Sequence, residues 1–172
     1  MRMISLLAAS VAMVAAEGCF AAGASMCQEN EQVIWTCSVE KGGKIGSLCA
    51  APKLDAKSGY VQYRFGTPEA VEMVFPASTE QTQKQFIYSR YTQPQVTYLH
   101  VRFRNAGYTY TMEDSRDGSP ELDAEEKLAA NGSWLSVVTP KGKEVRMRCA
   151  SDSKGALMKL EDVLPNEDFL HE

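Results

Sequence analysis

Residues 33–49 constrain the fold more than any other segment, because they predict a β-hairpin with a cysteine in each arm. Apolar and polar residues alternate through residues 33–40, as expected of a strand that buries one face. The inward positions of this strand are predicted to be Val33, Trp35, Cys37 and Val39. Gly42 and Gly43 follow, and paired glycines between two strands predict a tight turn whose central residues have positive φ.

The cysteines predict two disulfides. The chain has five cysteines, and Cys19 lies in an N-terminal segment that we expect to be removed, which leaves an even number. Cys37 and Cys149 both fall on the inward side of their predicted strands. We therefore expect Cys37 to pair with Cys149 and Cys27 to pair with Cys49. Disulfides persist in oxidising compartments, so this pattern also predicts an exported protein.

Alternating segments continue through most of the chain and predict an all-β protein. A second clear hairpin places Leu99, Val101 and Phe103 inward before a turn at residues 105–107, with Tyr108, Tyr110 and Met112 inward after it. About eight or nine short strands with one short helix are typical of a single antiparallel β-barrel or β-sandwich, here stapled by disulfides. Periodicity alone leaves barrel and sandwich open.

The chain is predicted to contain a secretory signal peptide, residues 1–24, and one β domain, residues 25–172. Arg2 precedes an apolar run that is too short to span a membrane, and Ala22 and Ala24 suit signal-peptidase cleavage. The alternative is a lipoprotein site at Cys19, and the protein would touch a membrane only in that case. The expected location is therefore the periplasm.

Two parts of the β domain are predicted to lack strands. Residues 113–126 contain seven acidic residues and one arginine, and we expect an acidic loop that leads into a short helix capped by Ser119 with Pro120 in its first turn. Residues 151–172 are predicted to form a polar C-terminal tail, with one or two helical turns around Leu157 to Val163.

Motifs that would indicate an enzyme or a metal site are absent from the sequence. It has no phosphate-binding glycine loop, no zinc-protease helix motif and no nucleophile elbow. We therefore expect no catalytic residues, no metal and no cofactor. His100 is predicted to be an exposed strand residue, and the acids around Asp117 and Gly118 lack the ligand spacing of a calcium loop.

Charge argues against a nucleic-acid partner. The formal net charge is −4, and residues 1–24 contribute one arginine and one glutamate, so the balance is the same after cleavage. Several arginines share strands with tyrosines and could form a basic aromatic face, but scattered outward arginines are the simpler interpretation. These residues are Arg64, Arg90, Arg102 and Arg104.

The ends of the domain suggest a family. An exported β domain that opens on Trp35-Thr36-Cys37 and closes on a strand ending at Cys149 resembles the periplasmic and membrane-bound inhibitors of c-type lysozyme. Asn131-Gly132-Ser133-Trp134 and Thr139-Pro140-Lys141-Gly142 are similar to two motifs of that family. The resemblance implies that loop residues enter the cleft of a cell-wall hydrolase, and it implies partner contacts at Ser133, Trp134, Lys141 and Gly142.

The sequence leaves two other functions open. An acidic protein suits a cationic hydrolase as partner, and that hydrolase could be an effector delivered by a rival bacterium, which would make this chain a periplasmic immunity protein. Alternatively, a Tyr-rich and Arg-bearing outer face could bind glycan or lipid headgroups in a non-catalytic envelope module.

Overall fold

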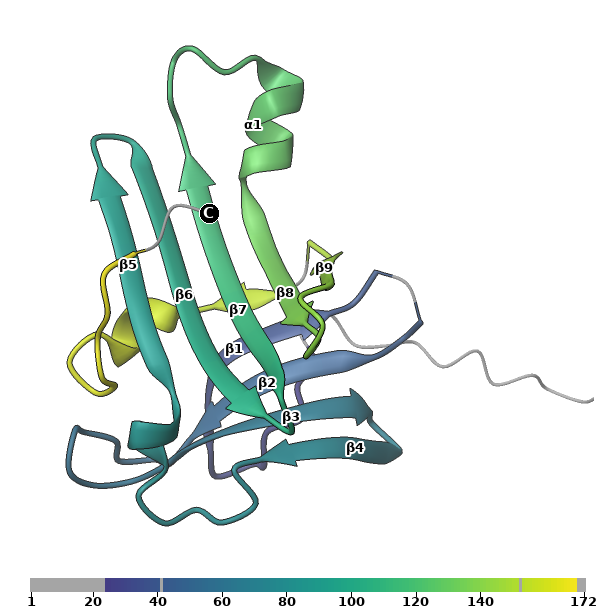
Figure 1. The fold of residues 1–172 in the computed structure, drawn as a ribbon, viewed down its shortest axis with the longest axis vertical. Coiled ribbons are helices and arrows are strands. Elements are labelled where there is room, and N and C mark those ends of the chain that lie inside the picture. Colours follow the sequence, from purple (N-terminus) through teal and green to yellow (C-terminus); the bar gives the residue numbers. More distant parts are fainter. Residues whose placement is uncertain (1–23, 41, 152, 170–172) are drawn as a thin grey trace, which may run out of the picture.

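The computed structural model describes residues 24–40, 42–151 and 153–169. Two antiparallel sheets pack face to face as a sandwich that does not close into a barrel, which decides the architecture that the sequence left open (Figure 1). Residues 1–23 of the predicted signal peptide, Cys19 among them, lie outside the described residues, whereas Ala24, its last predicted residue, is described and accepts a hydrogen bond from the Thr36 hydroxyl at 3.0 Å. No helix in the described part of the chain has both the length and the apolar character needed to cross a membrane.

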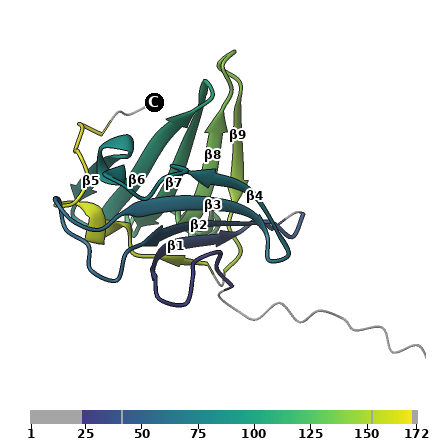
Figure 2. The same cartoon turned by 90° about the horizontal axis from the view of Figure 1, so that it is seen from below.

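The first sheet has the strand order β10-β1-β2-β3-β4. Its strands are β1 (Gln32–Ser38), β2 (Ile45–Ala50), β3 (Val61–Thr67), β4 (Ala70–Phe75) and the two-residue β10 (Lys154–Gly155). Without β10 it is a four-stranded sheet. The strands of this sheet run steeply across those of the second sheet, as the two views together show (Figures 1 and 2). Such crossed packing is one of the two usual arrangements of stacked sheets.

The second sheet keeps sequence order, β5-β6-β7-β8-β9. Its strands are β5 (Ile87–Gln93), β6 (Val96–Asn105), β7 (Tyr108–Asp117), β8 (Gly132–Val138) and β9 (Glu144–Arg148). The predicted hairpin around residues 105–107 joins β6 and β7, with Val101 paired to Met112. Leu99, Val101, Phe103 and Met112 are buried, as expected, whereas Tyr108 is 39% exposed at the strand end.

The two disulfides have the predicted pairing. Cys37 is bonded to Cys149 and Cys27 to Cys49. The first bond joins the end of β1 to the residue after β9, where Val39 and Cys149 also form an isolated bridge between the sheets. These two bonds indicate an oxidising compartment reached by export.

The first hairpin differs from its prediction in two details. Gly42 and Gly43 have the expected positive φ values of 101° and 63°, but the strands are closed by a bond from Val39 N to Lys44 O, so the loop is wider than a two-residue turn. A β-bulge between Val33 and Trp35 also shifts the register. Ile34 and Trp35 are therefore both buried, whereas Val33 is 39% exposed.

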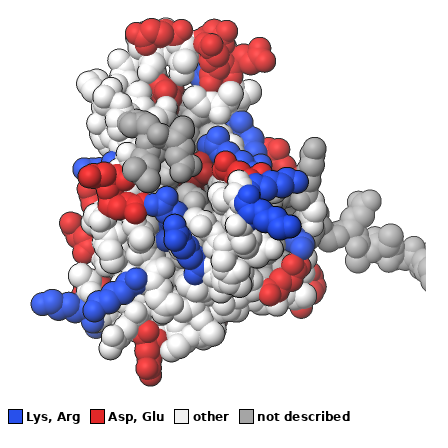
Figure 3. Space-filling view, in the orientation of Figure 1, with Lys and Arg blue, Asp and Glu red and all other residues white. Residues whose placement is uncertain are grey.

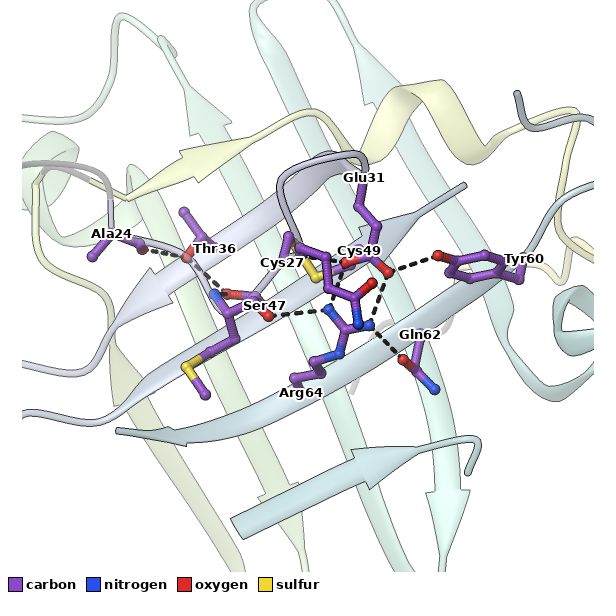
Figure 4. Close-up of a disulfide and its surroundings, with 11 residues drawn as sticks. Ala24, Cys27, Glu31, Thr36, Ser47, Cys49, Tyr60, Gln62 and Arg64 are labelled. Carbon is purple, nitrogen blue, oxygen red and sulfur yellow. Dashed lines mark hydrogen bonds and ion pairs between the residues drawn. A yellow bond between two sulfur atoms is a disulfide. The ribbon is translucent and has the colours of Figure 1, made fainter. Parts of the chain in front are cut away.

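The segment before β1 is held against the outer side of the first sheet by the Cys27–Cys49 bond and a charged network (Figure 4). Arg64 donates to both carboxylate oxygens of Glu31, at 2.5 and 2.8 Å, and Tyr60 donates to the same carboxylate at 2.8 Å. Burial opposes ionisation of Glu31, but these hydrogen bonds outweigh it and lower its pKa. Arg64 is thus a structural residue and not part of a basic face.

The predicted acidic loop at residues 113–126 is wrong in its first half. Residues 113–117 complete β7, because all five pair with β6 and residues 113–115 pair with β8 as well. The helix α1 (Ala124–Ala130) begins later than predicted. Its N-cap is Asp123, whose carboxylate accepts hydrogen bonds from the backbone N–H groups of Glu125 and Glu126. In return, the Glu126 carboxylate accepts from the backbone N–H of Asp123. Neither Ser119 nor Pro120 lies at the start of this helix.

The C-terminal segment is also more than the predicted polar tail. After β10 it forms the short 3-10 helix η2 (Leu157–Leu160), and Leu157, Leu160 and Leu164 are all buried in the core. Tyr88 and Asn166 then form a bridge that fastens the segment beside β5. The segment therefore covers one end of the space between the sheets.

Candidate functional site

The outer face of the second sheet carries a polar groove of about 680 Å³. Strand alternation builds it, because the residues between the buried positions of β6 and β7 must point away from the core. Among the residues that line it are His100, Arg102, Arg104, Glu113, Trp134 and Arg146. Basic side chains lie across the middle of this side of the molecule with acidic side chains beside them, and a separate acidic group lies at the α1 end (Figure 3).

Pairing across β6 and β7 sets the floor of the groove. His100 lies opposite Glu113, Arg102 opposite Thr111 and Arg104 opposite Thr109. Residues directly opposite each other on one face are in side-chain contact range. The groove therefore contains two neighbouring Arg–Thr pairs and, nearer α1, a His–Glu pair.

Glu113 and Arg146 form the main ion pair of the groove. Arg146 donates from Nε at 3.1 Å and from Nη2 at 2.6 Å to the same oxygen of Glu113. Burial raises the pKa of Glu113, and Arg146 opposes that rise. The Arg146 guanidinium also lies 4.6 Å from the ring centre of Trp134, and that of Arg148 lies 5.4 Å from the same ring. Trp134 is thus held in place and only 7% exposed.

His100 is half-buried and not exposed as predicted, because the C-terminal segment covers it. The ring centre of Phe169 lies 4.5 Å from that of His100. Burial lowers the pKa of His100 to about 4, and the positive charges of Arg102 and Arg146 act in the same direction. The imidazole is therefore neutral at neutral pH.

The C-terminal segment also supplies a carboxylate to the groove. Glu167 forms an ion pair with Arg102. Arg104 is exposed and, within the part of the chain that the structure describes, makes no ion pair. The groove therefore offers arginine donors for an anionic group, one of them already engaged by the protein's own carboxylate.

Lys141 and Gly142 lie together at the tip of the β8–β9 hairpin. Both are exposed, and Gly142 has a φ of 79°. The turn is closed by backbone bonds from Thr139 N to Lys143 O and from Gly142 N to Thr139 O, each 2.9 Å. Lys143 N also donates to the Thr139 hydroxyl at 3.1 Å. The tip is thus a compact, hydrogen-bonded turn with Lys141 at its surface.

Ser133 and Trp134 lie at the other end of β8, so the four predicted contact residues do not form one surface. Five residues of strand separate Ser133 from Val138, roughly 17 Å at the usual rise. Ser133 faces inward, where its hydroxyl donates to Asp114 at 2.5 Å. Trp134 faces outward into the groove. Only Lys141 and Gly142 share the exposed tip.

A second cavity, of about 630 Å³, opens at the α1 end of the sandwich. Its polar lining includes Asp114, whose Oδ1 accepts from the Trp35 indole at 3.1 Å and from Ser133. A Cβ on Gly155 would lie 2.0 Å from Oδ2 of Asp114, so the glycine allows β10 to pass this carboxylate. These groups bind one another, which is the pattern of a structural site.

Cys27, Glu31 and Cys49 bring potential metal-ligating atoms within 4.8 Å of one another. Their sulfurs are joined in a disulfide, so they carry no thiolate, and Glu31 is bound by Arg64. We therefore assign this cluster a structural role.

Sequence reasoning named His100, Arg102 and Arg104 but missed the partners that make their face a groove. Glu113 is predicted to lie in a loop but belongs to β7, and no role is predicted for Arg146, which donates to it from β9. Counting alternate residues through β7, β8 and β9 would have placed Glu113, Trp134 and Arg146 on one face. The spacing of Leu157, Leu160 and Leu164 was likewise an available signal that the tail returns to the core.

Comparisons with protein-family models, curated proteins and solved structures find no match to this chain. The similarity to lysozyme inhibitors therefore stays a prediction.

Proposed function

We propose that this protein is an exported envelope protein that binds and inhibits a lysozyme-type cell-wall hydrolase. The periplasm is its proposed location, and the β8–β9 tip is its proposed contact surface. The observation that carries the proposal is the exposed Lys141 on a closed turn of a disulfide-linked scaffold.

The tip suits insertion into a cleft for a physical reason. A loop that is ordered before binding loses little conformational entropy on association. Pro140 restricts one backbone angle of the turn, and three hydrogen bonds close it. The scaffold beneath is linked covalently, because Cys149 after β9 is bonded to Cys37.

Lys141 suits the chemistry of the target. Glycosidases of this type use a pair of carboxyl groups that flank the scissile bond. An ammonium group brought to that pair would make charge-assisted hydrogen bonds and block access of the substrate. The acidic residues of α1 lie at the opposite end of β8, so the proposal assigns them no contact with the cleft.

The test is cell-wall turnover by c-type lysozyme with stoichiometric, oxidised mature protein at low and high salt. We expect inhibition that weakens with salt, and at least a tenfold loss of potency in Lys141→Ala. Lys57→Ala, which removes an exposed lysine outside the second sheet, is the matched control and should inhibit as the wild type does. Absence of inhibition at micromolar protein would refute this target.

A further inference from the structure

We propose that the outer groove of the second sheet binds a saccharide that carries a carboxylate, with Arg102 and Arg104 as its anchors. This inference is independent of the hairpin tip and of the proposed inhibition.

The groove already holds a carboxylate. Glu167, from the C-terminal segment, pairs with Arg102 on the face formed by β6 and β7. Arginine binds carboxylates through paired, directional donors, which makes it selective for this group. An external carboxylate of suitable shape can take the same position by displacing Glu167.

Further hydrogen-bond donors lie beside the position of this carboxylate. Arg104 is exposed, lies two residues along β6 on the same face, and is not engaged in an ion pair with any residue that the structure describes. Thr109 and Thr111 lie opposite Arg104 and Arg102, and no side-chain hydrogen bond is formed by either hydroxyl within the described residues. Together these four residues form the Arg–Thr patch.

The side chains that line the groove also indicate the class of ligand. Paired hydroxyls beside arginines suit a polyhydroxylated molecule with a single negative charge, because the threonine hydroxyls can donate to and accept from its hydroxyl groups. The volume of about 680 Å³ is within the range of small-molecule sites. A polyanion such as nucleic acid fits less well, since Arg146 is neutralised by Glu113 and the chain carries a net charge of −4.

The charge state of His100 is consistent with an anionic ligand in this groove. Burial is the main cause of the lowered pKa of His100, and the positive charges of Arg102 and Arg146 lower it further, so His100 adds no positive charge of its own to the groove at neutral pH.

The test uses two disaccharides that differ by one O-lactyl group, which carries the carboxylate. Calorimetric or NMR titration of the oxidised mature protein with N-acetylglucosaminyl-N-acetylmuramic acid is compared with titration by N,N′-diacetylchitobiose, which lacks the lactyl carboxylate. We expect binding of the acidic disaccharide, at least tenfold tighter than that of the neutral one. Equal affinity for the two, or no binding of the acidic one at millimolar concentration, would overturn the proposal.

Variants locate the site. Arg102→Gln and Arg104→Gln should each weaken binding of the acidic disaccharide about tenfold, as expected for a lost charged hydrogen bond. Arg90→Gln is the matched control, since Arg90 pairs with Glu161 away from the groove. Undiminished binding by both groove variants would place the ligand elsewhere and overturn the assignment.

Glu167→Gln tests the internal competitor. Removing this charge should tighten binding by about two- to fivefold, because the ligand no longer displaces a carboxylate from Arg102. Unchanged affinity would refute that role for Glu167. Lys141→Ala should leave disaccharide binding unchanged, and Arg104→Gln should leave lysozyme inhibition unchanged, so failure of one proposal is distinguishable from failure of the other.

Discussion

The indole Nε1 of Trp35 in β1 donates to Oδ1 of Asp114 in β7 at 3.1 Å, which links the two sheets through a buried polar contact. Ser133 of β8 donates to the same oxygen. Burial raises the pKa of Asp114, whereas the two hydrogen bonds lower it in part. One carboxylate thus joins three strands from two sheets.

Asp114→Ala should destabilise the protein by about 2–4 kcal/mol, because it leaves the Trp35 N–H and the Ser133 hydroxyl without their acceptor. Asp114→Asn, which retains an oxygen acceptor, should cost less. Urea unfolding monitored by tryptophan fluorescence measures both, with exposed Asp162→Ala as the neutral control. Equal stability of the Ala and Asn variants would show that the acceptor oxygen does not matter.

Removal of the Cys37–Cys149 disulfide should cost more than removal of Cys27–Cys49. The bonds span 112 and 22 residues of sequence, and in the chain-entropy model such loops correspond to about 5 and about 3 kcal/mol. The comparison is between the two double Cys→Ala variants in chemical unfolding. The reverse order would mean that anchoring the N-terminal segment through Cys27–Cys49 contributes more to the free energy of unfolding than loop closure by Cys37–Cys149 does.

Tyr63→Phe should stabilise the protein by about 1 kcal/mol, because the Tyr63 hydroxyl is buried and has no hydrogen-bond partner among the described residues. The ring itself packs 5.1 Å from Phe103, and the phenylalanine retains this contact. Tyr60→Phe is the matched control and should instead be destabilising, since its hydroxyl donates to Glu31. Thermal unfolding of both variants measures the difference.

The wild type should lose stability relative to His100→Gln as pH falls from about 6.5 to about 4. The folded pKa of His100, about 4, lies below its ordinary value of 6.5, so the unfolded chain binds the proton first in this window. The difference should reach about 3 kcal/mol at its acidic end. Glu113 and Arg146 also face this side chain and are present in both proteins.

Unfolding curves at several pH values give this difference directly, and NMR titration of the imidazole provides an independent check. A pH-independent difference between the two proteins would show that His100 titrates normally in the fold.

Local patterns predicted the strands well where one face is buried along the whole element. The hairpin of β6 and β7 is such a case, because Val101 and Met112 recur at period two on the core side. The alternation of apolar and polar residues gave a wrong prediction at Val33, where a bulge shifts the register. It also failed at residues 113–117, which are polar and yet belong to strand β7. Glu113 and Asp114 looked like loop residues because acids usually lie in solvent, yet Arg146 and Trp35 supply their partners from distant strands.

The candidate site could be predicted only in part for the same reason. Lys141 and Gly142 are adjacent in sequence, so their place in one turn followed from local signals. The groove combines β6, β7, β8, β9 and the C-terminal segment, and no local rule relates Arg102 to Glu167.

The sequence by itself determined the all-β class, the alternation of the main strands and the choice of disulfide partners, because these follow from side-chain periodicity over a few residues. Only the tertiary structure decided that the sheets form an open sandwich and that leucines of the C-terminal segment pack into its core. It also decided that the carboxylates of Asp114 and Glu113 have hydrogen-bond partners. Those outcomes depend on contacts between segments that are far apart in the chain. Such contacts stabilise the protein only once the sheets have packed.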